Sequence, residues 1–154
     1  MKEISVYIAG PLYSSGDLVT NTRRAIDAAH ELEQTQITGI VYRPFVPHLL
    51  VPTWQLVHPR GHVEAQEWDD YWLRKCDALL RIPGVSAGSD HEVALAQSLH
   101  IPVFQQIAHV HVWAKLVLLR DELRLTRDNP ATTCPITGGC GQCLSGMPCT
   151  YTAR

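Results

Sequence analysis

The sequence lacks the features that would assign it to several common classes of protein. Its 154 residues carry a formal net charge of −2 at pH 7 with histidine neutral, so there is no excess of positive charge for binding a nucleic acid polymer. No apolar run is long enough to span a membrane. The apolar run at the N-terminus is too short for a signal peptide. We therefore expect a cytoplasmic protein that has neither nucleic acid nor a membrane as a partner.

Common nucleotide-binding and metal-binding motifs are also missing. No Gly-x-Gly-x-x-Gly sequence follows the first predicted strand, and no Gly-Lys-Ser/Thr loop occurs in the chain, which argues against a dinucleotide-binding motif and a P-loop. The eight histidines do not show the helical spacing of a zinc protease. We interpret them as loop histidines, of which His48 and His91 are the candidates for substrate contact.

The residues that are present predict one α/β domain at residues 1–128, followed by a cysteine-rich tail at 129–154. Hydrophobic residues make up 45% of the chain, which is ordinary for a domain with a core. Strands and helices alternate, which is typical of a doubly wound, mainly parallel, three-layer sheet of the Rossmann-like or flavodoxin-like kind. The predicted strands are Ile4–Ala9, Gly39–Pro44, Ala78–Ile82 and Ile101–Phe104, and the predicted helices are Leu18–Gln34 with Asp17 as N-cap, Val63–Lys75, Asp90–His100 and Val112–Arg127.

Two segments invite more specific predictions. Residues 44–63 contain four prolines and are expected to form a long irregular loop, and loops of that length are usually functional. Its apolar part, Leu49–Trp54, is expected to pack over the site or against a partner subunit. The last helix is expected to bury a stripe formed by Trp113, Leu116, Val117 and Leu123.

Small-residue turns follow the first and third predicted strands. They are Ala9-Gly10-Pro11 and the segment Pro83–Glu92. Ligands bind beyond the carboxyl ends of the strands in open α/β sheets, so both turns would line one crevice if these strands are neighbours. The second turn leads into a helix start, which favours an anion. The predicted substrate-binding residues are Gly10, Pro11, Tyr13, Ser86, Gly88 and Ser89.

Carboxylates near these turns predict the chemistry. Glu92 is placed in the first turn of its helix, Asp69 and Asp70 lie on the preceding helix, and Tyr7 flanks the same crevice. Two carboxylates can break a glycosidic bond when one attacks the anomeric carbon and the other moves a proton. Such a reaction needs no cofactor.

Each of these residues also has a purely structural interpretation. Glu92 could complement a helix dipole, and the two aspartates could belong to a solvated helix face. The serines could be helix caps, and the tyrosines could pack in the core or at its rim. The residues alone leave these alternatives open.

Four segments of the chain occur together in a known superfamily. They are Tyr7-Ile8-Ala9-Gly10-Pro11, Asp69-x-x-Trp72-Leu73-x-x-x-Asp77, Ser86-x-Gly88-x-x-x-Glu92-x-x-x-Ala96 and Ile101-Pro102-Val103. In order and spacing they resemble the nucleoside 2-deoxyribosyltransferase-like superfamily, including its short nucleotide N-glycosidase members. The resemblance covers about residues 3 to 105.

The resemblance implies a role for each matching residue. Glu92 would attack the anomeric carbon of a 2-deoxyribose and form a glycosyl-enzyme intermediate, and Asp69 would bind or protonate the base. Tyr7 or Tyr13 would orient the glutamate or stack beside the base, and Ser86 would support a 5′-phosphate. The resemblance also implies a homodimer whose subunits complete each other's sites.

One departure from the superfamily concerns the phosphate. Its hydrolases often carry arginine at the start of the phosphate loop, whereas this chain reads Leu12-Tyr13-Ser14-Ser15-Gly16. Arg23 or Arg24 on the following helix is the candidate replacement.

The cysteine tail has a symmetric spacing. Four cysteines, Cys134, Cys140, Cys143 and Cys149, lie among glycines, and glycines permit the tight turns that bring thiolates around one metal. We predict a structural zinc; the alternatives are an iron–sulfur cluster, two disulfides or free thiols. Cys76, alone in the body of the chain, is interpreted as a buried apolar residue.

Together these patterns predict an enzyme that cleaves the N-glycosidic bond of a (deoxy)nucleoside or its 5′-monophosphate, by hydrolysis or by base exchange. The alternative is a non-catalytic nucleotide sensor or binding module on the same fold. A third interpretation is a different nucleotide-processing enzyme, because fold does not determine function.

Overall fold

The structure, a computed structural model, describes residues 1–14 and 17–128. The elements, in chain order, are β1 (Lys2–Ala9), α1 (Leu18–Gln34), β2 (Ile40–Phe45), the short 3-10 helix η1 (Pro47–Leu49), α2 (Val51–Val57), α3 (His62–Leu73), β3 (Ala78–Arg81), α4 (Ala87–Ser98), β4 (Val103–Phe104) and α5 (Ile107–Asp128). No helix in this described part is long and apolar enough to cross a membrane.

The chain divides into two compact units. The first unit is Met1–Leu116 and the second begins at Val117. Of the second unit, the structure describes only the C-terminal part of α5. The four cysteines of the predicted metal site lie outside the described residues.

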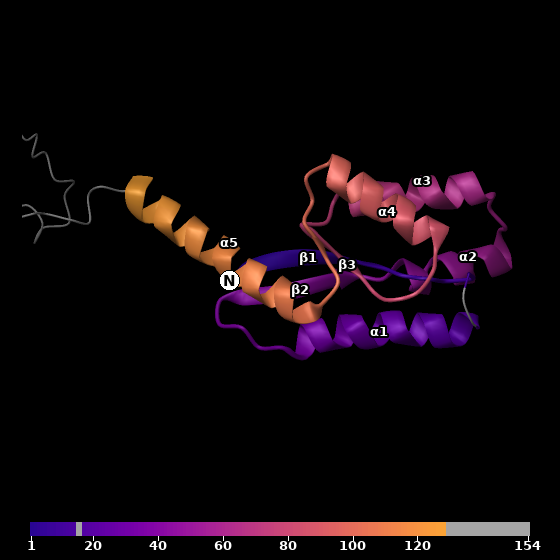
Figure 1. Cartoon of the computed structure of the whole chain (residues 1–154), viewed down its shortest axis with the longest axis horizontal. Helices are drawn as coiled ribbons and strands as arrows, with labels where there is room; N and C mark the ends of the chain where they lie inside the picture. Colours follow the sequence, from indigo (N-terminus) through magenta and orange to yellow (C-terminus); the bar gives the residue numbers. More distant parts are fainter. Residues whose placement is uncertain (15–16, 129–154) are drawn as a thin grey trace, which may run out of the picture. The chain divides into compact units, whose positions relative to one another are not determined.

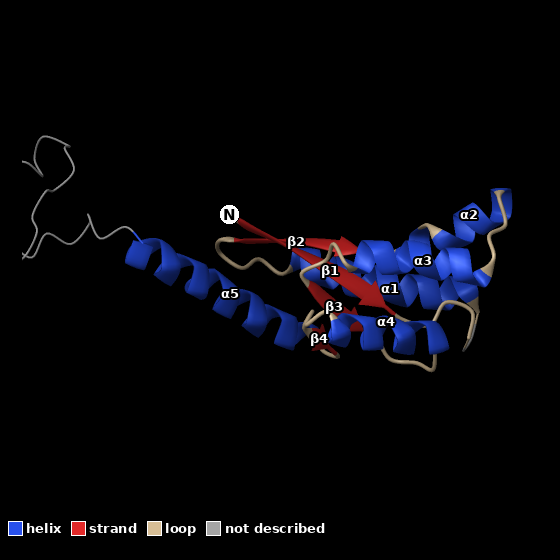
Figure 2. Cartoon of the chain, turned by 90° about the horizontal axis from the view of Figure 1, so that it is seen from above, coloured by secondary structure: helices blue, strands red, loops and turns tan. Residues whose placement is uncertain are grey.

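The first unit is an α/β domain built on a four-stranded sheet. All strand pairs are parallel and the order is β2-β1-β3-β4, as Figure 2 shows. In Figure 1, α1 covers one face of this sheet, and α3 and α4 lie on the other. β1 is central, and Val6, Tyr7 and Ile8 are fully buried. β1 and β3 are neighbours, since Tyr7 pairs with Leu79, so the condition under which both small-residue turns would line one crevice is met.

Helix α1 has the predicted bounds and the predicted cap. The carboxylate of Asp17 accepts hydrogen bonds from the backbone N–H groups of Val19 and Thr20, two of the donors that a helix start leaves unpaired. Its buried face includes Ala25 and Leu32, whereas Ile26 is 40% exposed.

Residues 44–63 are not the irregular loop that their prolines predicted. η1 and α2 occupy half of this segment. Pro47 and Pro52 stand at the first positions of these helices, where the missing proline N–H costs nothing because that donor has no intrahelical partner. Proline therefore begins helices here instead of preventing them.

The helices α4 and α5 begin earlier than their sequence patterns predicted. α4 starts at Ala87 because the Ser86 hydroxyl caps it by accepting a hydrogen bond from Ser89 N–H. Glu92 therefore lies in the second turn of α4, not in the first. α5 starts at Ile107.

The buried stripe predicted for α5 is also partly wrong. In the first unit α5 buries Val110 and Ala114 completely, whereas Leu116 is 60% exposed. Trp113 is half-buried, as are Val117 and Leu118. Leu123 is 70% exposed.

Gly10 allows the turn after β1 to lie against the end of β3. A Cβ atom at this position would overlap Cγ1 of Ile82 and lie 2.5 Å from its Cδ1. Because Ile82 is itself buried, we expect Gly10→Ala to lower the free energy of unfolding by about 1–3 kcal/mol, measured by urea denaturation. Gly88→Ala is the matched control, since the nearest atom to a Cβ there is 3.9 Å away and alanine favours a helix. Equal stability of the two variants would contradict the steric argument.

Candidate active site

A cavity of about 450 Å³ opens at the carboxyl ends of β1, β2 and β3. This volume lies within the range of about 300–1,000 Å³ that small-molecule sites have. Its walls come from the turn after β1, from the segment between β2 and α3, and from the start of α4. Two carboxylates, Glu92 and Asp69, face it from different helices.

Glu92 is held in place by Tyr7 of the central strand. The Tyr7 hydroxyl donates a 2.6 Å hydrogen bond to Oε1 of Glu92. Tyr7 is fully buried and Glu92 is 9% exposed. Burial raises the pKa of Glu92 to about 8, and the negative charge of Asp69 also raises it, whereas the Tyr7 hydrogen bond and the positive charge of Arg81 lower it. Burial likewise raises the pKa of Tyr7 well above its usual value, so its hydroxyl remains a donor.

Asp69 is a second carboxyl group that titrates near neutral pH. Its pKa is raised to about 7, first by burial and then by the neighbouring charge of Asp70. Asp70 points elsewhere: both of its carboxylate oxygens lie close to Nε2 of His91, at 3.0 and 3.1 Å. Consecutive residues on a helix face different directions. Asp69 therefore lines the cavity and Asp70 does not.

Unpaired buried polar atoms concentrate in this cavity. Within the described residues, four buried side-chain polar atoms have no hydrogen-bond partner in the protein: His48 Nδ1, Asp69 Oδ1, Ser89 Oγ and Trp72 Nε1. All but the tryptophan belong to residues that line the cavity. An unpaired buried polar group costs about 1–3 kcal/mol.

His48, one of the residues that line the cavity, has a neutral ring with an unpaired acceptor. Its Nε2 lies 3.1 Å from the carbonyl oxygen of Pro11, and a carbonyl can only accept, so Nε2 carries the proton. Burial lowers the pKa of His48, which keeps the ring neutral. Nδ1 is then an unpaired acceptor.

Most of the predicted substrate-binding residues line the cavity together. They are Gly10, Tyr13, Ser86, Gly88 and Ser89. Pro11 is buried, and its carbonyl oxygen accepts a hydrogen bond from His48. Tyr7 donates a hydrogen bond to Glu92, which does line the cavity. Of the two histidines considered for substrate contact, His48 lines the cavity and His91 does not. The interpretation of both as loop histidines was wrong, since His48 belongs to η1 and His91 to α4.

The sequence analysis missed one wall of the cavity. Gln55, Arg60 and Gln66 line it from α2, from the connection after α2, and from α3. The sequence signal for this wall was the apolar segment Leu49–Trp54, which was expected to pack over the site or against a partner subunit. Val51 of this segment does line the cavity. The side chains that would contact a ligand could not be selected without knowing that α2 is a helix.

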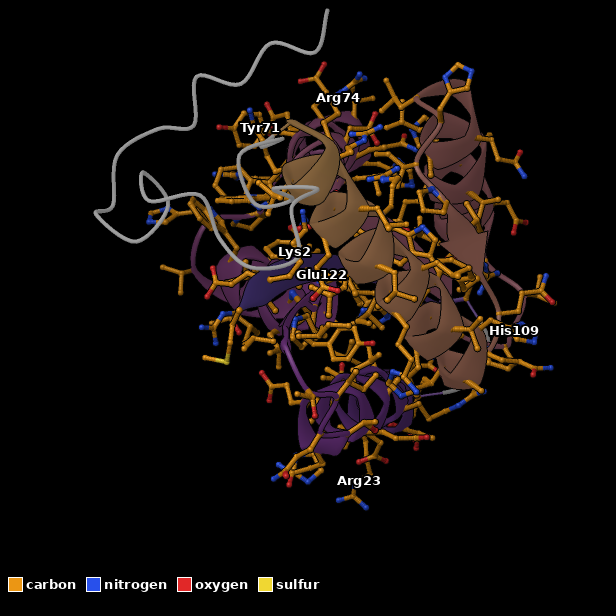
Figure 3. All side chains as sticks on the ribbon, turned by 90° about the vertical axis from the view of Figure 1, so that its left-hand side faces the viewer. Lys2, Arg23, Tyr71, Arg74, His109 and Glu122 are labelled. Carbon is orange, nitrogen blue, oxygen red and sulfur yellow. The ribbon has the colours of Figure 1, made fainter. Side chains whose placement is uncertain are left out.

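Neither of the two arginines proposed as phosphate ligands reaches the cavity. Arg24 donates a 2.9 Å hydrogen bond to the carbonyl oxygen of Pro83 and lines a different depression, beside α1. The side chain of Arg23 points outward from α1 (Figure 3). Neither is among the residues that line the cavity.

No cluster of three or more histidine, cysteine or acidic side chains in the described part of the chain has the arrangement of a metal site. Cys76, the cysteine of the body, is half-buried, and burial raises the pKa of its thiol to about 12.

Comparison of the chain with protein-family models, curated proteins and solved structures found no match. The geometry of the cavity and the resemblance of the four sequence segments are therefore the basis for a functional proposal.

Proposed function

We propose that the protein cleaves the N-glycosidic bond of a (deoxy)nucleoside or its 5′-monophosphate, as a nucleoside deoxyribosyltransferase or a nucleotide N-glycosidase does. One observation carries the proposal: two carboxyl groups with raised pKa values, Glu92 and Asp69, line one cavity of nucleoside size. Glycosidic bond cleavage uses such a pair, one as nucleophile and the other as acid and base.

The reaction would proceed in two displacements. The Glu92 carboxylate attacks C1′ of the sugar as the bond from C1′ to the base nitrogen breaks, and the departing base takes both electrons of that bond and a proton from Asp69. Water then attacks C1′, its proton passes to the Asp69 carboxylate, and Glu92 leaves. In base exchange, the nitrogen of a second base replaces the water.

Strand order supports a finer description of the fold. The order 2-1-3-4 matches the first four strands of the flavodoxin-like doubly wound sheet, whose ligands bind at the switch point between its first and third strands. The cavity lies at that point, between the turn after β1 and the start of α4.

The homodimer and the structural zinc of the cysteine tail stay predictions.

The direct test is release of free base from a panel of deoxynucleosides and their 5′-monophosphates, followed by chromatography. We expect at least one member to yield free base, and a second base added to the mixture to give a new nucleoside only if the enzyme is a transferase. Saturable binding of a nucleotide without base release over long incubation would contradict the proposal and favour a non-catalytic binding module.

Tyr7→Phe tests the positioning of the nucleophile. The Tyr7 hydroxyl stabilises the anionic form of Glu92, so its loss should raise the pKa of Glu92 further. A hydrogen bond to a charged group contributes about 1.5–3 kcal/mol. We expect kcat/KM for base release at pH 7 to fall by about 10- to 100-fold, and the deficit relative to the wild type to shrink as pH rises, since both proteins lose the Asp69 proton alike. The measurement is the pH dependence of kcat/KM.

Tyr42→Phe is the matched control for this substitution. It also removes a bonded hydroxyl, since the Tyr42 oxygen lies 2.8 Å from Nδ1 of His111, but Tyr42 does not line the cavity. Superimposable pH profiles for wild type and Tyr7→Phe would exclude a positioning role for Tyr7.

A further inference from the structure

Arg60 gives the cavity a single fixed positive charge. Among the described residues that line it, Arg60 is the only arginine or lysine. The guanidinium group makes no hydrogen bond and no ion pair with the described part of the chain. A half-buried arginine without an acidic partner is unusual, since charged groups that leave water are normally paired.

The protein nevertheless holds this side chain in position. Its guanidinium carbon lies 3.8 Å from the centre of the Trp54 ring and 5.3 Å from that of Trp68. A guanidinium group over an aromatic ring is stabilised by its charge, and its N–H donors stay available at the edge.

The backbone of Arg60 is fixed as well. The side chain of Gln55 binds it twice: its Oε1 accepts a 2.9 Å hydrogen bond from Arg60 N–H, and its Nε2 donates a 3.2 Å hydrogen bond to the Arg60 carbonyl. Two rings and one amide therefore position a guanidinium group that has no hydrogen-bonding or acidic partner in the described chain.

From these contacts we infer that Arg60 is the anion-binding residue of the cavity, and that its ligand carries a negatively charged oxygen group such as a phosphate or a carboxylate. The planar fork of donors fits both groups in a bidentate manner. Arg60 is the only group of the described lining that offers this fork, since the other basic side chains there are two histidines: His48, which is neutral for the reason given above, and His62. The inference rests on the proposed function only for taking the ligand to be a nucleoside or nucleotide.

The test measures binding, so it does not depend on turnover. Calorimetry would compare four deoxynucleoside 5′-monophosphates with the matching deoxynucleosides, and would include orotidine, whose acid group is a carboxylate on the base. We expect one anionic class to bind wild-type protein about 10- to 100-fold more tightly than the uncharged nucleosides. Preference for monophosphates identifies a phosphate, and preference for orotidine identifies a carboxylate on the base.

Three variants locate the source of that preference. Arg60→Gln should abolish it, and Arg60→Lys should retain part of it, because lysine keeps the charge without the fork. Arg23→Gln removes the same charge from an outward-facing site on α1 (Figure 3) and should leave the preference unchanged. Circular dichroism would verify that each variant is folded.

Two results would overturn the assignment: equal affinity of the wild type for charged and uncharged ligands, or a preference that survives in Arg60→Gln. These outcomes are separate from failure of the proposed function. Anion binding that depends on Arg60 without release of base would refute the reaction alone, and base release without an effect of Arg60 on anion preference would refute the anion site alone.

Discussion

Replacing Glu92 with glutamine is expected to reduce the rate of base release by about 10³-fold or more, because the amide cannot act as the nucleophile. Glutamine has nearly the same shape, and its oxygen can still accept the hydrogen bond from Tyr7 that the structure shows. The loss would therefore arise from the missing carboxylate and not from a collapsed cavity. The measurement is the initial rate on the best substrate of the panel.

Two further measurements separate a nucleophile from a carboxylate that only binds substrate. Mass spectrometry of rapidly quenched wild-type enzyme should detect a sugar adduct on the peptide that contains Glu92, and the adduct should be absent from the glutamine variant. In Glu92→Ala, added azide should restore turnover and yield a glycosyl azide, because a small anion can enter the space that the side chain leaves.

Glu67→Gln is the control for the rate of base release in Glu92→Gln. Glu67 is an exposed carboxylate on α3, the helix that also carries Asp69, and its replacement should leave the rate within about twofold of wild type. Full activity of Glu92→Gln would remove Glu92 from the mechanism and leave the cavity without its proposed nucleophile.

The parts of the fold that the sequence predicts well are those whose local pattern agrees with their packing. The buried end of β1, from Val6 to Ala9, is a continuous apolar run, and α1 has both helical periodicity and an acidic cap. The errors occur where a local signal has two meanings. Proline interrupts helices in their interior but is tolerated at their first positions, and Ala87-Gly88 can form either a loop or a helix start capped by Ser86.

The candidate site was predictable as far as it depends on strand ends. Parallel strands bring the turns after β1 and β3 to one edge of the sheet, so Gly10 and Ser86 could be grouped from the sequence alone. The choice between Asp69 and Asp70 required the packing of α3, because neighbouring helical residues point in different directions. Arg60 could not be selected, because its position depends on rings from two separate helices.

The free energy of unfolding is expected to respond to pH through the same two carboxyl groups, whatever the reaction. The pKa of Glu92 is about 8 and that of Asp69 about 7 in the folded protein, whereas unfolded carboxyl groups titrate near 4. The folded state therefore binds more protons than the unfolded state between about pH 4 and pH 8. Stability from these groups is fully present below about pH 4 and is lost as pH rises through their folded pKa values.

Glu92→Gln isolates one of these contributions. Glutamine cannot ionise, so the variant keeps the stability that the wild type loses when Glu92 ionises, although both proteins still lose the contribution of Asp69. At pH 8.5 the unfolding free energy of the variant should exceed that of the wild type by an amount on the order of 5 kcal/mol. The difference should shrink as pH falls and vanish near pH 4. Because both proteins contain His48, whose lowered pKa acts in the opposite direction, comparing them at each pH cancels its effect.

Urea denaturation of wild type, Glu92→Gln and the control Glu67→Gln across pH 4 to 8.5 would measure this effect. A gain that is independent of pH, or one of equal size in the control, would mean that Glu92 is not a buried carboxyl group with a raised pKa. A gain that grows with pH, combined with loss of base release, would show that the same buried carboxylate lowers stability and supplies the reaction. The buried position that makes Glu92 costly to ionise would then also be what frees its carboxylate from water to attack C1′.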